Sequence, residues 1–236
     1  MWTVISDLHL FSHRSRALRH MPAIVEALRQ SEALILNGDI FDFNWSIHGG
    51  TEPTINAAEE WLRQLMDTAP HGRLYYLLGN HDGVSAWAER CEVLSEVLSG
   101  FHWSPDYLRL GDTLFTHGDL LLGSEPLETR PLKTEVRPRK AAMGRAYEVV
   151  SHLRIPRIAT LCYPTQRCAR VIFRNFQQLD PKFTDGVRRI CMGHTHRPFS
   201  QLAIDGLEIY NTGSTIAGMP FRPLVLQVPE DQGVAS

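Results

Sequence analysis

The chain has 236 residues, of which 43% are hydrophobic and 21% charged, and its formal net charge is −2. This composition is typical of a globular protein with one large domain. No run approaches the roughly 18 apolar residues of a membrane span, and the start lacks a basic segment followed by an apolar one, so we expect neither secretion nor membrane insertion. The four cysteines form no CxxC pair, which argues against a zinc–thiolate site and favours reduced thiols in the cytoplasm.

Predicted strands and helices alternate through the first third of the chain. Apolar runs predict strands at 2–6, 33–36 and 74–78, and helical spacing of apolar residues predicts helices at 16–30, 57–66 and 86–98. This order predicts parallel strands joined by right-handed crossovers. Each strand runs directly into a polar block. Because α/β sheets bind ligands where parallel strands end, these blocks are expected to meet at one edge of the sheet.

Shorter strands dominate the second half of the chain. They are predicted at 107–110, 113–116, 189–192, 199–204, 207–211 and 223–228. Gly111-Asp112 and Asp205-Gly206 are typical of hairpin turns. Together with the first third, these strands predict an α/β fold of two stacked mixed sheets flanked by helices.

Residues 122–186 interrupt the strand pattern, and we predict that they form a helical cap insertion within a single domain covering 1–236. Helical spacing occurs at 141–153 and 168–179. Between residues 125 and 190 the chain has 14 Lys or Arg against 6 Asp or Glu, whereas the rest has 10 against 20. This split favours a basic face for an anionic partner, and solvated helix faces without a partner are the alternative.

Five short polar blocks carry the chemical signal. They read Ser6-Asp7-Leu8-His9, Gly38-Asp39-Ile40-Phe41-Asp42, Gly79-Asn80-His81-Asp82, His117-Gly118-Asp119 and Gly193-His194-Thr195-His196. Carboxylate, imidazole and amide side chains bind hard or borderline divalent ions, and two such ions about 3.5–4 Å apart serve to displace an oxygen on phosphorus. A single Asp after a strand is more often a helix cap, and a lone His is usually an ordinary surface or core residue. Their joint occurrence at successive strand ends is what predicts a metal centre.

In this order, the blocks D-x-H, G-D-x-x-D, G-N-H-D, a lone H and G-H-x-H resemble the signature of the calcineurin-like metallophosphoesterase superfamily. The resemblance covers about residues 1–120 and 189–215 and implies a four-layer α/β/β/α sandwich. It implies that one metal binds Asp7, His9, Asp39 and His196, and that the other binds Asp39, Asn80, His117 and His194. It also implies that a metal-bridging hydroxide attacks phosphorus, that His81 protonates the leaving oxygen, and that Asp42 orients His81.

The identity of the two divalent ions is open at this stage, with manganese favoured and iron, zinc or magnesium as alternatives. Asp82 and Asp119 either cap a turn or support the ligands. The segment Asn211-Thr212-Gly213-Ser214 is predicted to form a turn near the metals.

Within the superfamily, D-L-H-L near the start, a helical cap before G-H-T-H and an R-P pair after it resemble the UDP-2,3-diacylglucosamine pyrophosphatases of lipid A biosynthesis. A cap that is both basic and rich in apolar residues suits a lipid-linked phosphoester and peripheral contact with the inner membrane face. The alternative is an apolar stripe that only packs on the core.

Other substrates stay open. The pyrophosphatases typically carry Arg at the position of His81, whereas His is typical of general phosphomonoesterases and phosphodiesterases of the superfamily. A phosphoprotein phosphatase and a catalytically silent scaffold are further alternatives. Nucleic acid is disfavoured, because aromatic residues are not interleaved with the basic ones. The sequence makes no prediction about the oligomeric state.

Overall fold

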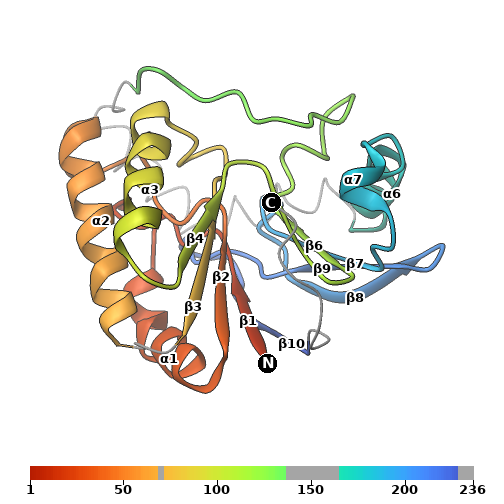
Figure 1. Cartoon of the computed structure of the whole chain (residues 1–236), viewed down its shortest axis with the longest axis horizontal. Helices are drawn as coiled ribbons and strands as arrows, with labels where there is room; N and C mark the ends of the chain where they lie inside the picture. Colours follow the sequence, from red (N-terminus) through yellow and green to blue (C-terminus); the bar gives the residue numbers. More distant parts are fainter. Residues whose placement is uncertain (69–71, 137–164, 228–236) are drawn as a thin grey trace.

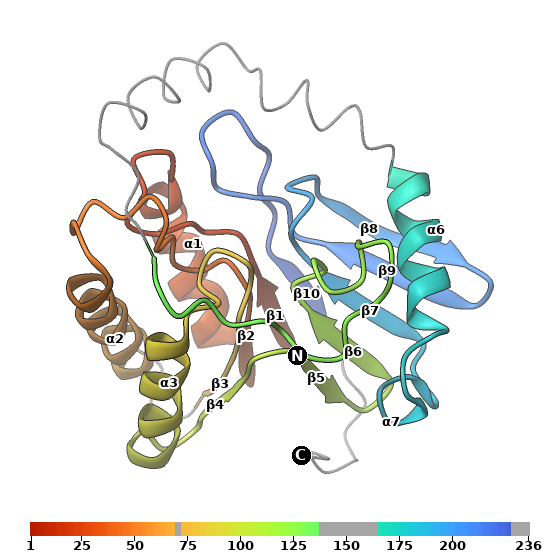
Figure 2. The same ribbon diagram turned by 90° about the horizontal axis from the view of Figure 1, so that it is seen from above.

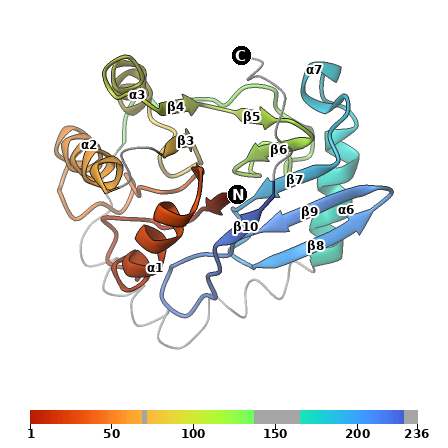
Figure 3. The same ribbon diagram turned by 60° about the horizontal axis from the view of Figure 1, so that its bottom comes forward.

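The computed structural model describes residues 1–68, 72–136 and 165–227. Two five-stranded sheets lie face to face, and helices cover the outer side of each sheet (Figure 1). Figure 3 shows α1, α2 and α3 on one side of the sheets and α6 on the opposite side. The predicted four-layer α/β/β/α sandwich is therefore confirmed.

The first sheet has the order β10-β1-β2-β3-β4. Its strands are β1 (Trp2–Ile5), β2 (Ala33–Asn37), β3 (Arg73–Leu77), β4 (Phe101–Ser104) and β10 (Leu224–Leu226). Strands β1 to β4 are parallel, and β10 pairs antiparallel with β1. Its outer face is covered by α1 (Ala17–Gln30), α2 (Thr51–Asp67) and α3 (Ser85–Val97) (Figure 2).

The second sheet has the order β5-β6-β7-β9-β8. Its strands are β5 (Tyr107–Leu110), β6 (Thr113–Thr116), β7 (Arg189–Met192), β8 (Phe199–Ile204) and β9 (Leu207–Asn211). The β5–β6 and β8–β9 pairs are antiparallel and enclose the two predicted hairpin turns. Strands β6, β7 and β9 are parallel, so β6 and β7 end at the same edge.

Strand residues alternate between two apolar layers. In β2, Leu34 and Leu36 pack under the helices, whereas Ala33 and Ile35 pack between the sheets against residues such as Phe115. Burial on both faces explains why these strands read as continuous apolar runs. An apolar layer thus lies between the two sheets, and polar groups gather where the strands end.

Two differences from the sequence-based prediction concern the first sheet and the helices that cover it. Helix α2 begins at Thr51 rather than at residue 57; Pro53 lies in its first turn, where a missing N–H costs no helical hydrogen bond. Strand β4 was not predicted, because only its first residue, Phe101, is buried and the rest reads as polar. Both differences lie away from the polar blocks.

Part of the predicted cap segment lies within the described residues. Helix α6 (Thr165–Phe176) packs Ala169, Ile172 and Phe176 against the second sheet, followed by α7 (Pro181–Thr184). For these residues the apolar stripe packs on the core, which was the alternative to a lipid groove. The predicted helix at 141–153 lies outside the described residues, and the extent of the insertion stays a prediction. Among the described helices, none is long and apolar enough to cross a membrane.

Candidate metal centre

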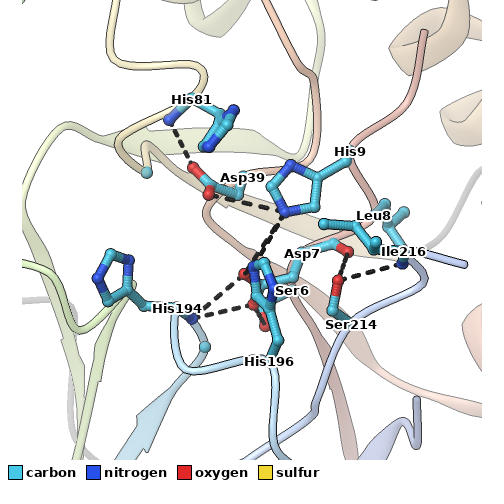
Figure 4. Close-up of polar contacts among 12 residues, drawn as sticks. Ser6, Asp7, Leu8, His9, Asp39, His81, His194, His196, Ser214 and Ile216 are labelled. Atoms are coloured by element: carbon cyan, nitrogen blue, oxygen red, sulfur yellow. Dashed lines mark hydrogen bonds and ion pairs between the residues drawn. The ribbon is translucent and has the colours of Figure 1, made fainter. Parts of the chain in front are cut away.

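The polar blocks follow strands of both sheets and converge at one edge of the sandwich. Asp7 follows β1, Asp39 follows β2 and Asn80 follows β3, while His117 follows β6 and His194 follows β7. Backbone hydrogen bonds join the loops, from His9 N to the Asp39 carbonyl at 2.9 Å and from Gly193 N to the His117 carbonyl at 2.9 Å. Figure 4 shows His9, Asp39 and His196 gathered around Asp7, with the backbone N–H of His194 directed at the Asp7 carboxylate.

The predicted ligands form overlapping groups of donor atoms. Asp7, His9 and His196 offer ligand atoms within 4.8 Å of one another, and so do Asp7, Asp39 and His117. His117 Nε2 lies 3.2 Å from Asp39 Oδ2, and His196 Nε2 lies 3.2 Å from Asp7 Oδ1. Asn80 Oδ1 is 2.9 Å from His194 Nδ1. All seven predicted ligands are therefore brought together, and their division between two ions stays a prediction.

The backbone at these positions is strained in a way that aims the side chains inward. The predicted ligands with positive φ are Asp7 (54°), His9 (46°), Asp39 (52°), His194 (63°) and His196 (55°). Left-handed conformations cost non-glycine residues roughly 1–3 kcal/mol each and are retained where function requires them. These conformations lower the stability of the fold, and they turn each side chain from the strand direction toward the centre.

Glycines next to the ligands leave the room that the ligands occupy. A Cβ added at Gly38 would lie 2.6 Å from the His117 ring. At Gly79 and Gly193, an added Cβ would overlap the carboxylates of Asp39 and Asp7, respectively. The glycine in each of these three blocks therefore has a steric reason, because real Cβ atoms do not approach other atoms so closely.

The donor set fits cations. Among the described residues, the buried His117 Nε2 makes no hydrogen bond of good geometry, although it lies 3.2 Å from Asp39 Oδ2, and the Nε2 atoms of His9 and His196 face each other at 3.2 Å. Inward-facing imidazole nitrogens and carboxylate oxygens without a thiolate are what zinc, iron or manganese use in open sites. These observations support a site for two divalent ions.

The buried carboxylates and imidazoles of the centre shift one another's pKa values. Burial alone would raise the pKa of Asp39, but His117 and His81 outweigh it and hold that pKa well below its ordinary value. Burial opposes the charged form of His117 too, yet Asp39 and Asp7 raise its pKa to about 10. Burial and the nearby His117 lower the pKa of His194 to about 4. The carboxylates thus stabilise a positive charge on His117, whereas burial disfavours one on His194.

His81 and Asp42 form a hydrogen-bonded pair beside the ligand cluster. His81 Nδ1 donates to Asp42 Oδ1 at 2.9 Å, and the His81 backbone N–H donates to Asp39 Oδ1 at 2.7 Å. Burial opposes the imidazolium, but Asp39 and Asp42 outweigh burial and raise the pKa of His81. His81 also lies within metal-binding reach of His9 and Asp39. The pair is placed where a charged imidazole faces the centre.

Asp82 and Asp119 support the ligand loops in different ways. Asp82 accepts hydrogen bonds from the backbone of Ile40 at 2.9 Å and from Tyr76 Oη at 2.7 Å, and so ties the β2 loop to β3. Asp119 forms a two-bond ion pair with Arg130. Neither carboxylate belongs to a candidate metal group among the described residues.

The sequence placed Ser6 in a polar block and residues 211–214 in a turn near the metals, but it did not indicate the contacts by which they hold the predicted ligands. Ser6 Oγ donates to Asp7 Oδ2 at 2.5 Å and contacts Thr212 Oγ1 at 2.5 Å. Asn211 Nδ2 donates to the Gly193 carbonyl at 2.5 Å. The turn predicted at 211–214 thus links β9 to the ends of β1 and β7. The only sequence signal was the position of this polar turn directly after a strand.

The fold and this site define a class of protein, the metal-dependent phosphoesterases of the two-sheet sandwich type. The family model for calcineurin-like phosphoesterase matches residues 3–198. The chain belongs to this family, and it is a phosphoester hydrolase.

Curated relatives cover most of the chain. A UDP-2,3-diacylglucosamine hydrolase of Pseudomonas aeruginosa is 27% identical over 216 residues, which span 86% of this chain and 85% of the relative. A protein of the same description from Pseudomonas paraeruginosa is 27% identical over 98% of this chain and 92% of the relative. Among solved structures, a dimetal phosphatase from Danio rerio is 12% identical, with a TM-score of 0.46 over 92% of this chain and 88% of that chain.

Proposed function

We propose that the protein hydrolyses a pyrophosphate or phosphodiester bond of a lipid-linked nucleotide sugar of the UDP-2,3-diacylglucosamine type. The observation that carries the substrate proposal is the similarity to UDP-2,3-diacylglucosamine hydrolases over 86–98% of the chain. At 27% identity this similarity supports a substrate class and a place in lipid A biosynthesis as a proposal.

The proposed division of the site is the one that the resemblance to the family implies. Asp7, His9, Asp39 and His196 would hold one ion, and Asp39, Asn80, His117 and His194 the other. When bound, such ions activate water and neutralise charge that develops on the phosphoryl oxygens. Mn²⁺ is the proposed native ion, and activity measured with Mn²⁺, Fe²⁺, Zn²⁺ and Mg²⁺ in turn tests that choice.

His81 is the proposed general acid. Its Nδ1 donates to Asp42 Oδ1, which leaves Nε2 to give a proton to the oxygen that leaves phosphorus. Asp42 is fully buried. Burial is the largest single effect on its pKa and raises it, but the imidazoles of His81 and His9 together lower the pKa below its ordinary value. A carboxylate that stays charged favours the protonated form of His81.

A second candidate function is a general phosphomonoesterase or phosphodiesterase. The His81–Asp42 pair favours it, because the pyrophosphatases that the chain resembles typically carry Arg at this position. A phosphoprotein phosphatase would use the same groups on a larger substrate.

Peripheral contact with an anionic membrane is proposed for the face that α6 presents to solvent. Arg167, Arg170 and Arg174 are exposed on α6, while Ile172 and Phe176 pack on the sheet. Residues three and four apart share a helix face, and each basic residue near an anionic surface adds about 1 kcal/mol of attraction.

The proposed function is tested by comparing UDP-2,3-diacylglucosamine, bis-p-nitrophenyl phosphate and p-nitrophenyl phosphate as substrates with Mn²⁺. A kcat/KM on the lipid conjugate far above that on the two esters supports the substrate proposal. Hydrolysis of the esters alone supports the second candidate. A substrate without acyl chains should show a raised KM, and equal kinetics with and without the chains would contradict a lipid-binding role.

A further inference from the structure

Arg14 lies next to the His81–Asp42 pair and belongs to none of the five polar blocks. Its side chain is 8% exposed, and its Nη2 donates to Asp42 Oδ2 at 2.5 Å. It stands in the loop between β1 and α1, five residues after the predicted ligand His9. A buried guanidinium at this position needs an explanation, because burying a charge without a partner is costly.

The two carboxylate oxygens of Asp42 accept hydrogen bonds from different residues. Oδ1 accepts from His81 Nδ1 at 2.9 Å and from the Trp45 backbone N–H at 3.1 Å. Oδ2 accepts from Arg14 at 2.5 Å. With Arg14 on one oxygen and His81 on the other, rotation of the carboxylate would break charge-assisted hydrogen bonds, which are the strong ones.

Arg14 is itself held from several sides. Its Nε donates to Ser12 Oγ at 3.3 Å, and its guanidinium carbon lies 4.9 Å from the Trp45 ring centroid. Its backbone carbonyl accepts from the Ala217 N–H at 2.8 Å. Stacking on an aromatic ring and a fixed fork of donors are properties of Arg that Lys lacks.

We propose that Arg14 is a positioning residue that fixes the Asp42 carboxylate, and through it His81, for protonation of the leaving oxygen. This inference rests on the proposed hydrolytic function. In that reaction, water oxygen bonds to phosphorus and releases its proton to solvent. The bond from phosphorus to the leaving oxygen breaks with its electron pair on that oxygen, which takes the proton from His81. Arg14 touches neither bond and acts only through Asp42.

The test uses two phosphodiesters that differ in their need for an acid. Diphenyl phosphate releases phenolate, which is about as basic as a tyrosine side chain, with a pKa near ~10, and therefore needs the proton. Bis-p-nitrophenyl phosphate releases a much weaker base and does not. We expect Arg14→Met to lower kcat on diphenyl phosphate roughly tenfold or more, and on bis-p-nitrophenyl phosphate by less than about threefold.

Arg14→Lys keeps a positive charge and guards against loss of folding. Arg14→Lys should also lose more kcat on diphenyl phosphate than on bis-p-nitrophenyl phosphate, but both losses should be smaller than those of Arg14→Met. The kcat on diphenyl phosphate should therefore fall in the order Arg, Lys, Met at position 14. In a His81→Ala background, Arg14→Met should change kcat on diphenyl phosphate by less than about twofold, because residues that act as one unit are not additive. Arg19→Met, on the exposed face of α1, is the matched control and should leave both rates unchanged.

Equal losses on both esters for the Met and Lys variants would overturn the inference, since a general structural defect does not distinguish leaving groups. An undiminished effect of Arg14→Met without His81 would overturn it too. The wild-type protein tests the underlying function separately: if it hydrolyses neither of these esters nor UDP-2,3-diacylglucosamine with Mn²⁺, the proposed function fails and this inference falls with it.

Discussion

At the scale of single residues, the contact between His81 and Asp42 supports the proposed role of His81 in proton delivery. His81 donates to Asp42, and only its backbone N–H touches the ligand Asp39. Its side chain is 19% exposed, whereas those of His9 and His117 are fully buried. This partial exposure would let His81 meet a substrate, although it does not set His81 apart from the predicted ligand His196, whose side chain is 23% exposed.

His81→Ala should keep the metals and lose the acid. We expect kcat on a substrate with a basic leaving group to fall by roughly 10²–10⁴-fold, the range of general acid catalysis. Metal content, measured by elemental analysis of the purified variant, should stay at the wild-type level. His102→Ala, an exposed histidine of β4, is the control, and unchanged turnover of His81→Ala would remove His81 from this role.

The sequence predicted which polar residues would lie together at the centre, but not the residues that support them. Asp7, His9 and Asp39 stand in short patterns whose residue types and order are specific. Arg14 and Arg130 stand in no such pattern, because their partners Asp42 and Asp119 are 28 and 11 residues away along the chain. The positive φ of Asp7 and His194 could not be predicted from the sequence either, because Asp and His do not require a left-handed conformation.

At the scale of elements, the junctions between strands and loops determine the geometry of the centre. Each ligand loop begins where an apolar strand ends, and a glycine beside the ligand leaves space for a neighbouring side chain. Gly193 has no positive φ, so only the space around its Cα, and not its conformation, restricts this position.

Gly193→Ala should therefore damage the centre through contact alone. The new Cβ would overlap the carboxylate of Asp7 and the side chain of Ser6. We expect a clear loss of metal affinity, measured by metal titration, together with lowered turnover. Gly50→Ala is the control, because its Cβ would meet Pro53 at an ordinary 3.5 Å. A Gly193→Ala protein with wild-type metal affinity would contradict this account.

A strap formed by residues 127–136 crosses the ligand loops. Arg130 pairs with Asp119 and donates through Nε to the Pro105 carbonyl at 2.9 Å. The Lys133 ammonium contacts the Asn80 carbonyl, and its backbone N–H donates to the Gly83 carbonyl at 3.0 Å. The strap thus joins the loops after β3 and β6.

Arg130→Met should leave the largely buried Asp119 without its ion-pair partner, while His117 and His194 still favour its charged form. Breaking a buried ion pair in this way costs about 3–5 kcal/mol of unfolding free energy, which a guanidinium titration would measure. Adding Asp119→Asn should recover part of the loss. A single-variant loss below about 1 kcal/mol would show that the pair contributes no more than a surface pair.

At the scale of the whole molecule, the centre exists because two sheets are held in one relative position. Asn37 at the end of β2 donates through Nδ2 to the carbonyls of Thr116 and Cys191, each at 3.0 Å. These carbonyls belong to β6 and β7 of the other sheet. The fully buried amide thus joins the strand that precedes Asp39 to the strands that precede His117 and His194.

Asn37→Leu should loosen this connection between the sheets. It removes the donor from two buried carbonyls, and each unsatisfied group costs about 1–3 kcal/mol. We expect the midpoint of unfolding to move to a lower guanidinium chloride concentration. The unfolding free energy should depend on denaturant concentration as steeply as in the wild type. Asn56→Leu, on the exposed side of α2, is the control, and an unchanged midpoint for Asn37→Leu would contradict the role of Asn37.

The architecture of the whole chain was largely predictable, for a physical reason. Buried parallel strands such as β2 must be apolar on both faces, so they read as clear runs. Strand β4, which exposes His102, gave no such signal. Long-range pairing such as β10 beside β1 depends on the assembled sheet, and no local pattern encodes it.

The most direct test of the central claim is the number of divalent ions bound per chain by the wild type and by Asp39→Ala, measured together with hydrolysis of bis-p-nitrophenyl phosphate. Asp39 Oδ2 faces both His117 Nε2 at 3.2 Å and His9 Nε2 at 3.9 Å, so its removal should affect both ions. The account predicts two ions and metal-dependent turnover for the wild type, and loss of both for Asp39→Ala. Asp67→Ala, on the surface at the end of α2, should match the wild type. Two ions and full turnover in Asp39→Ala would contradict the account.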